Sequence, residues 1–81
     1  PLGELIEREL ESELRKAIEA LPAECRVVFK KSRIECKKYE EIASELGISV
    51  NTVKYHMKHA LSILYKRFGQ YLEVLLIYFF N

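Results

Sequence analysis

The chain has 81 residues, of which 49% are hydrophobic and 31% are charged, and its formal net charge is +1. This length corresponds to one domain, and the balance of apolar and charged residues is typical of a soluble globular protein rather than a disordered one. The longest dense apolar run, residues 71–80, is about half as long as a membrane-spanning helix. This run is too short to cross a membrane, so we expect no membrane contact. Two cysteines cannot form a disulfide framework, so we expect a cytoplasmic protein.

Charge is distributed unevenly along the chain. Residues 1–24 contain seven Glu and three Arg or Lys, whereas residues 25–70 contain four Glu and ten Lys or Arg. The basic middle suits a polyanionic partner such as nucleic acid, and we expect the acidic segment to face away from that partner. The acidic segment also lacks the apolar core of a signal peptide. Because the chain begins with Pro1 rather than Met, we expect a fragment of a longer protein.

Helix-forming residues are frequent while Gly and Pro are few, which favours an all-α fold, and we expect one small helical bundle over residues 1–81. The first expected helix spans residues 4–21, where six apolar residues recur at helical spacing: Ile6, Leu10, Leu14, Ala17, Ile18 and Leu21. Pro22 ends that helix and starts the next, which we expect to reach about residue 33. Residues 34–38 are expected to form a loop.

The next segment has the layout of a helix-turn-helix, which we place at about residues 39–67. A short helix, residues 39–46, is expected to turn three apolar side chains inward: Ile42, Ala43 and Leu46. Gly47 suits a left-handed helix C-cap, and Ser49 is a good N-cap for the next helix. We expect that longer helix to run from residue 50 to about 68, with its buried stripe at Val50, Val53, Met57, Ala60, Leu61 and Leu64.

An apolar tail, residues 70–81, follows Gly69, which we expect to end or bend the long helix. The tail has no clear period, so the pattern alone does not distinguish helix from strand. Two interpretations stay open. Tyr71–Phe80 either folds back onto the first two helices and completes the core, or forms an exposed apolar patch for a protein partner or for self-association.

The outer face of the long helix carries the candidate functional residues. Opposite its buried stripe lie Asn51, Lys54, Tyr55, Lys58 and Ser62, with His59 beside them. The chain has no acidic residue between Glu45 and Glu73, although it has 12 in all. The second helix of a helix-turn-helix enters the major groove of DNA with such a polar face. The pattern therefore predicts DNA binding.

Two segments of the chain resemble region 4 of bacterial sigma factors of the extracytoplasmic-function (ECF) group, within the sigma-70 family. The first is the pattern A-I-x-x-L-P-x-x-x-R-x-V-F from Ala17 to Phe29, and the second is Y-E-E-I-A-x-x-L-G-I-S-x-x-T-V-K from Tyr39 to Lys54. The second segment alone is shared with LuxR-type response regulators, and the first separates the two families. The tail after Tyr71 resembles, less specifically, the tails of such factors from Bacteroidetes.

This resemblance implies a domain that recognises the minus-35 promoter element and docks on the flap of the RNA polymerase β subunit. Anti-sigma proteins are a further class of partner that it implies. By position, Tyr55, Lys58 and His59 would face bases, and Thr52 and Lys54 would lie near phosphates. Lys38 and Tyr39 would lie against the DNA backbone. With Asn51 from the outer face, the candidate DNA-binding residues are Lys38, Tyr39, Asn51, Thr52, Lys54, Tyr55, Lys58 and His59.

The chain departs from the family pattern at several positions. Cys36 occupies a loop position where the family often has Gly, and Lys38 replaces the usual Ser or Thr cap before Tyr39. Two lysines, Lys37 and Lys38, at a helix N-terminus oppose the helix dipole, which makes better sense if a phosphate lies beside them. The recognition face has Lys and His where the family often has Arg, so the base sequence cannot be carried over.

Two alternatives remain open: a LuxR-type DNA-binding domain, and a protein-interaction module that keeps the helix-turn-helix shape without binding DNA. Catalysis is not expected, because the chain has no Asp and too few Gly for a phosphate-binding loop. Cys25 and Cys36 are too far apart in sequence for a zinc ligand pair, so no metal or other cofactor is expected. We expect Cys25 in the core, Cys36 in a loop, and His59 either at DNA or in solvent.

Overall fold

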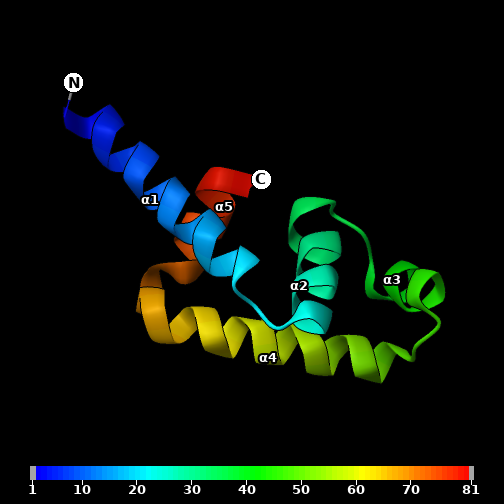
Figure 1. Ribbon diagram of the computed structural model, residues 1–81. Helices are drawn as coiled ribbons and strands as arrows, with labels where there is room; N and C mark the ends of the chain where they lie inside the picture. The colour runs from blue at the N-terminus through cyan, green and yellow to red at the C-terminus, as the bar shows by residue number, and fades with distance from the viewer. Residues whose placement is uncertain (1, 81) are drawn as a thin grey trace.

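The computed structural model describes residues 2–80, which form helices joined by short turns (Figure 1). In chain order the elements are α1 (Leu2–Glu19), α2 (Ala23–Phe29), the π-helical turn η1 (Lys30–Ile34), α3 (Tyr39–Leu46), α4 (Val50–Phe68), the 3-10 turn η2 (Gly69–Tyr71) and α5 (Leu72–Phe80). Over this range there is no strand. The all-α prediction is therefore confirmed.

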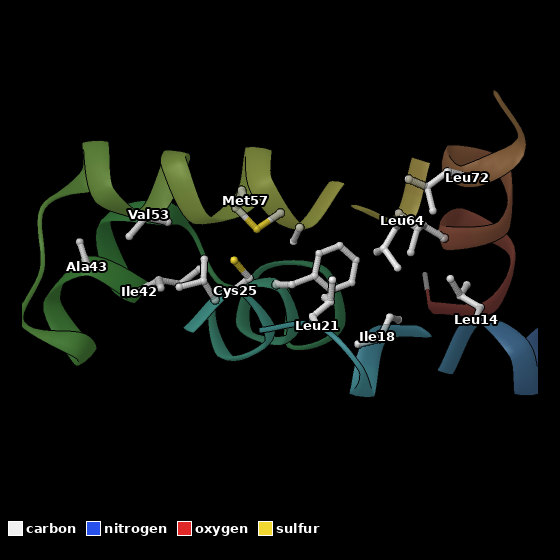
Figure 2. Packing of buried hydrophobic residues seen from close by; sticks show 14 residues of the cluster. Leu14, Ile18, Leu21, Cys25, Ile42, Ala43, Val53, Met57, Leu64 and Leu72 are labelled. Atoms are coloured by element: carbon white, nitrogen blue, oxygen red, sulfur yellow. The ribbon is translucent and has the colours of Figure 1, made fainter. Parts of the chain in front are cut away.

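The long helix α4 organises the rest of the molecule. Helices α2 and α3 pack against its amino-terminal part, while α5 packs near its other end together with α1 (Figure 1). All five helices contribute to one continuous core, in which Phe29 is the largest fully buried side chain (Figure 2). The expected stripe of α4 is buried at Val53, Met57, Ala60 and Leu64 and half-buried at Val50 and Leu61.

The ends of α4 and the turn before it follow the expected capping chemistry. The Ser49 hydroxyl accepts the backbone N–H of Thr52 at 3.1 Å, which satisfies one of the free donors at the helix start. Gly47 has φ 67°, the left-handed conformation expected after α3. Gly69 has φ 61° and ψ −146°, a backbone region that is open almost only to glycine. It ends α4 and lets the chain turn back into α5.

The junction between α1 and α2 gives a physical reason for the L-P-x-x-x-R pattern. Pro22 is the N-cap residue, so α2 begins one residue later than expected, at Ala23. The guanidinium of Arg26 donates to the backbone carbonyl of Glu19 at 2.8 Å. This carbonyl lies at the end of α1, where helix acceptors lack partners within the helix. Arg26 therefore stabilises the end of one helix from the first turns of the next.

The segment after α2 differs from the expected helix over residues 22–33 and loop over residues 34–38. Regular α-helix stops at Phe29 and continues as a π-helical turn through Ile34, where the N–H of Glu35 donates to the carbonyl of Lys30 at 2.9 Å. Cys36 then takes φ 59°. An L-residue in this left-handed conformation costs about 1–2 kcal/mol, so a glycine would fit this loop position without strain.

The apolar stripe of α1 is buried only in part, and one of the expected inward positions on α3 is wrong. Ile6 and Leu10 are 48% and 40% exposed, because the buried residues of α1, Leu14 and Ile18, lie in its second half. The amino-terminal half is reached by α5 through the Tyr78 hydroxyl, which donates to Glu7 at 2.7 Å. This half extends beyond the bundle and makes the molecule 46 Å long and about 20 Å wide. Leu46 is 36% exposed, because it is the last residue of α3 and lies at the rim of a groove beside α2.

The apolar tail forms the helix α5. One of its faces is part of the core, and the other is an exposed apolar surface. Leu72 and Leu76 are each 3% exposed and belong to the core, whereas Val74, Ile77 and Tyr78 remain exposed. The partners of α5 are α1, α4 and η1. Folding back onto the core is thus observed for one face of the tail. Within residues 2–80, no helix combines the length and the apolar character needed to cross a membrane.

Candidate nucleic-acid interface

The outward face of α4 presents most of the candidate DNA-binding residues. Asn51, Lys54, Tyr55, Lys58 and His59 are all exposed, and they occupy the side of α4 opposite its buried stripe. Because the buried stripe holds α4 on the rest of the bundle, this face is a rigid surface rather than a mobile loop. Such rigidity suits a helix that must enter a groove as one body.

The angle between α3 and α4 is set by small and apolar side chains at their junction. Ala43 is 7% exposed and Val53 is fully buried, so the two helices approach closely at these positions. Ile48 packs half-buried against the same cluster, and its N–H donates to the carbonyl of Ala43 at 3.0 Å. The Gly47–Ser49 turn therefore orients α4 relative to α3, as in a helix-turn-helix.

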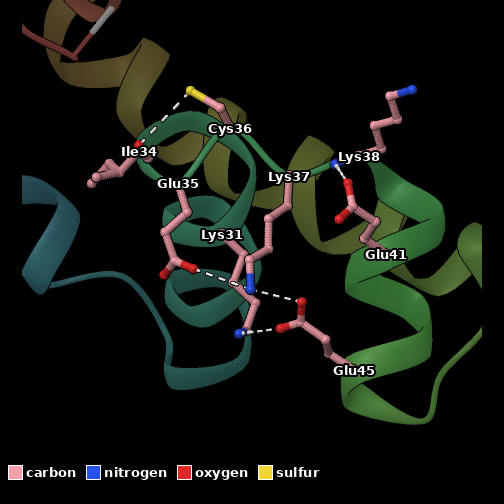
Figure 3. A network of polar contacts seen from close by, with 8 residues as sticks. All are labelled: Lys31, Ile34, Glu35, Cys36, Lys37, Lys38, Glu41 and Glu45. Carbon is pink, nitrogen blue, oxygen red and sulfur yellow. Dashed lines mark hydrogen bonds and ion pairs between the residues drawn. The ribbon is translucent and has the colours of Figure 1, made fainter.

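The lysines near this face fall into two groups. Lys31 and Lys37 both bind the carboxylate of Glu45, each at 2.7 Å (Figure 3). These hydrogen bonds lower the pKa of Glu45 and raise the pKa of Lys37. Within residues 2–80, neither Lys54 nor Lys58 forms an ion pair. The positive charge of these two is therefore available to an anion.

The expectation that both Lys37 and Lys38 await a phosphate needs correction for Lys37. Its ammonium group lies between Glu45 and Glu35, the second carboxylate at 3.5 Å, so the protein itself supplies its counter-charge. Lys38 occupies the N-cap position of α3, and its side chain points away from this network (Figure 3). Its backbone N–H donates to Oε1 of Glu41 at 3.1 Å, which is the half of a capping box that a Glu at the third helical position supplies.

Tyr39 and Thr52 are less accessible than the other candidates. The Tyr39 side chain is half-buried and packs against the core. The Thr52 hydroxyl lies 2.9 Å from the Ser49 hydroxyl, and its N–H bonds the same oxygen, so Thr52 is part of the α4 cap. The structure thus groups Thr52 with the helix start, whereas Lys54, Tyr55 and Lys58 are among the open side chains of the face.

His59 has a buried partner that the sequence pattern did not indicate. Its Nδ1 lies 3.3 Å from Sγ of Cys25, a core residue of α2 that is 2% exposed. Burial, reinforced by the charge of Glu24, raises the pKa of the Cys25 thiol. The two residues are 34 positions apart, so no local spacing could have predicted their contact. The expectation that Cys25 is a core residue is confirmed.

His56 occupies the interface between α4 and α2 rather than the outward face. Its Nε2 lies 3.6 Å from a carboxylate oxygen of Glu24. Its Nδ1 is buried and has no hydrogen-bond partner within residues 2–80. His56 also lines an apolar groove, together with Ala23, Glu24, Val27, Val28, Leu46, Ile48 and Thr52. In the same part of the chain, no group of three or more His, Cys, Asp or Glu side chains could hold a metal ion.

Comparison with known protein families shows which family the chain belongs to. Residues 11–64 match the family described as "Sigma-70, region 4", and this range contains both motif segments and more than half of the chain. Neither curated proteins nor solved structures gave a significant match. The match does not favour the LuxR-type alternative or a module without DNA binding, and the family is one of transcription factors rather than enzymes. The chain therefore belongs to the sigma-70 region 4 family, whose helix-turn-helix gives sigma factors a DNA-binding role in transcription by RNA polymerase.

Proposed function

We propose that this domain recognises the minus-35 promoter element as the C-terminal region of an ECF-type sigma factor. The observation that carries the proposal is the outward face of α4, where Lys54, Tyr55 and Lys58 are exposed and the lysines have no ion-pair partner in the described chain. In this proposal α4 enters the major groove, Tyr55, Lys58 and His59 face base edges, and Asn51 lies on the same face.

Phosphate contacts position the domain in the same proposal. Lys54 and Lys38 supply positive charge on either side of the Gly47–Ser49 turn, and the exposed start of α4 adds backbone N–H groups. Tyr39 and Thr52 contribute at the edge of the contact. Because the slope is about −0.9 for each phosphate that a lysine or arginine neutralises, Lys54 and Lys38 predict that log K falls with log salt at a slope of about −2.

The test is an NMR titration of the ¹⁵N-labelled chain with a pool of random DNA duplexes, first at low and then at higher salt. We expect shifts to cluster at residues 38–39 and 51–59 and to fade as salt increases. Lys16→Ala removes one exposed positive charge from α1 and is the matched control for Lys54→Ala, which should weaken binding. An unchanged spectrum, or shifts confined to α1 and α5, would contradict the proposal.

The second half of the proposal is docking on the flap of the RNA polymerase β subunit. The groove beside His56 supports it, because Val27 and Leu46 are 41% and 36% exposed there and Ile48 is only half-buried. Apolar side chains around a groove suit an apolar element of a protein partner. Val27→Glu should reduce binding to RNA polymerase core while leaving the DNA titration unchanged. Equal core binding by Val27→Glu and the unmodified chain would exclude this groove.

A further inference from the structure

The contact between Cys25 and His59 links the core to the proposed recognition face. Cys25 belongs to α2 and is 2% exposed, whereas His59 is on the exposed side of α4. Their Sγ and Nδ1 atoms are 3.3 Å apart, which is a hydrogen-bond distance for sulfur. Figure 2 shows the Cys25 sulfur pointing towards α4, beside Met57. The thiol is thus placed where it can determine how the imidazole is held.

The chemistry of the pair allows Cys25 to be the donor. Burial raises the pKa of Cys25, so the group is a protonated thiol at neutral pH and carries an S–H donor. A neutral imidazole has one N–H donor and one bare nitrogen acceptor, and the partner of each nitrogen decides the tautomer. If the thiol donates to Nδ1, that nitrogen is the bare one. The imidazole proton then resides on Nε2, on the side of the ring away from Cys25.

The neighbours of His59 limit the orientation of its imidazole ring. Tyr55, one helical turn earlier, has its ring centroid 6.2 Å from that of His59 at an angle of 48°. Tyr55 is itself exposed, so both rings belong to the same outward face of α4. A ring flanked by Tyr55 and bonded to Cys25 through Nδ1 has only Nε2 free for a ligand.

We propose that Cys25 is a positioning residue that holds His59 with its proton on Nε2 and directs that N–H towards DNA. This inference rests on the proposed function. In the major groove an N–H donor pairs with guanine O6 or N7, adenine N7 or thymine O4, and not with the amino group of cytosine. The pair would therefore make the domain favour an acceptor at one base position. Cys25 acts without touching DNA, because it is buried behind His59.

The first test measures the tautomer of His59 in the free chain by long-range ¹H–¹⁵N NMR correlation. We expect the Nε2–H form in the unmodified chain and in Cys25→Ser, which keeps a donor, and a mixture of forms in Cys25→Ala. Cys36→Ala changes the other cysteine, which is exposed, and should leave the tautomer of His59 unchanged. A fingerprint spectrum of each variant verifies its fold. The inference would be overturned by an Nδ1–H form in the unmodified chain, or by the same tautomer of His59 in all variants.

The second test measures discrimination between duplexes that differ at one base pair, starting from a sequence selected with the unmodified chain. One hydrogen bond contributes on the order of a 3- to 10-fold preference, so His59→Ala should lose that much at one base pair. Cys25→Ala should lose part of the same preference, and the double variant should lose no more than His59→Ala alone. Additive losses, or full discrimination by Cys25→Ala, would overturn the positioning role while leaving DNA binding intact. Failure of the unmodified chain to bind any duplex would instead overturn the proposed function and this inference with it.

Discussion

The guanidinium of Arg33 donates to both carboxylate oxygens of Glu73, at 3.1 and 3.5 Å, and so joins the π-helical turn η1 to the first turn of α5. The two side chains are 31% and 58% exposed. An exposed ion pair of this kind contributes about 0–1 kcal/mol. The pair therefore helps to set the direction of α5, while most of the stability of that contact comes from Leu72 and Leu76 on its buried face.

Two substitutions where α5 contacts the rest of the domain should therefore lower the free energy of unfolding by different amounts. Leu76→Ala should lower the free energy of unfolding by about 2–4 kcal/mol, because it leaves a cavity in the core. Arg33→Ala should lower it by about 1 kcal/mol or less. Urea denaturation followed by circular dichroism measures both. A small cost for Leu76→Ala, equal to that of Arg33→Ala, would mean that α5 is not part of the core.

Cys36→Gly should stabilise the domain. Cys36 has φ 59°, which strains any residue with a Cβ, whereas glycine adopts this conformation freely. Part of the gain is offset by the greater freedom of glycine in the unfolded chain, so we expect a net increase of about 0.5–1 kcal/mol. Cys36→Ala retains the strain and is the matched control. Its urea midpoint should stay near that of the unmodified chain, and a Cys36→Gly midpoint below both would contradict the argument.

The bonds of Glu45 predict an acid-sensitive contact between η1 and α3. Hydrogen bonds from Lys31 and Lys37 lower the pKa of Glu45 below its ordinary value of 4.5. Since the folded state holds this carboxylate in its charged form, the contact contributes stability above pH 4.5 and loses it as pH falls through the lowered pKa. Glu45→Gln should therefore weaken the fall in unfolding free energy on acidification.

Urea denaturation at neutral pH and below the lowered pKa of Glu45 measures this effect. Glu40→Gln removes a carboxylate from the same helix that has no ion pair within residues 2–80, and it is the matched control. The stability difference between Glu45→Gln and the unmodified chain should be largest at neutral pH and should shrink in acid. A difference that stays constant with pH would show that the bonds to Lys31 and Lys37 do not form in solution.

The DNA-facing residues should separate into two classes. Tyr55→Ala and Lys58→Ala should change the preference at one base pair by about 1–3 kcal/mol, because these side chains face base edges in the proposed complex. Lys38→Ala should weaken all duplexes about equally and reduce the salt slope by about one. Binding to a set of single-base variants at two salt concentrations distinguishes the classes. Identical behaviour of all three variants would contradict the assigned roles.

The local elements were largely predictable, because the signals that define them are local. Ser49, Gly47 and Gly69 mark the ends of α3 and α4, and each has the capping role or backbone angle that its residue type favours. The spacing of Val53, Met57, Ala60 and Leu64 also identified the buried side of α4, and hence its outward face. The π-helical turn was missed, because no residue pattern in Lys30–Ile34 distinguishes it from an α-helix.

The all-α fold, the helix-turn-helix and the sigma-70 family could be read from the sequence, since periodicity, caps and motif spacing act over a few residues. Tertiary structure alone decided which apolar residues find a partner: Leu14 and Ile18 are buried, whereas Ile6 and Leu10 on the same stripe are exposed. It also decided that Lys37 is neutralised by Glu45, and that His59 meets the thiol of Cys25. These contacts join residues from different elements, and a pattern along one chain contains no measure of the distance between them.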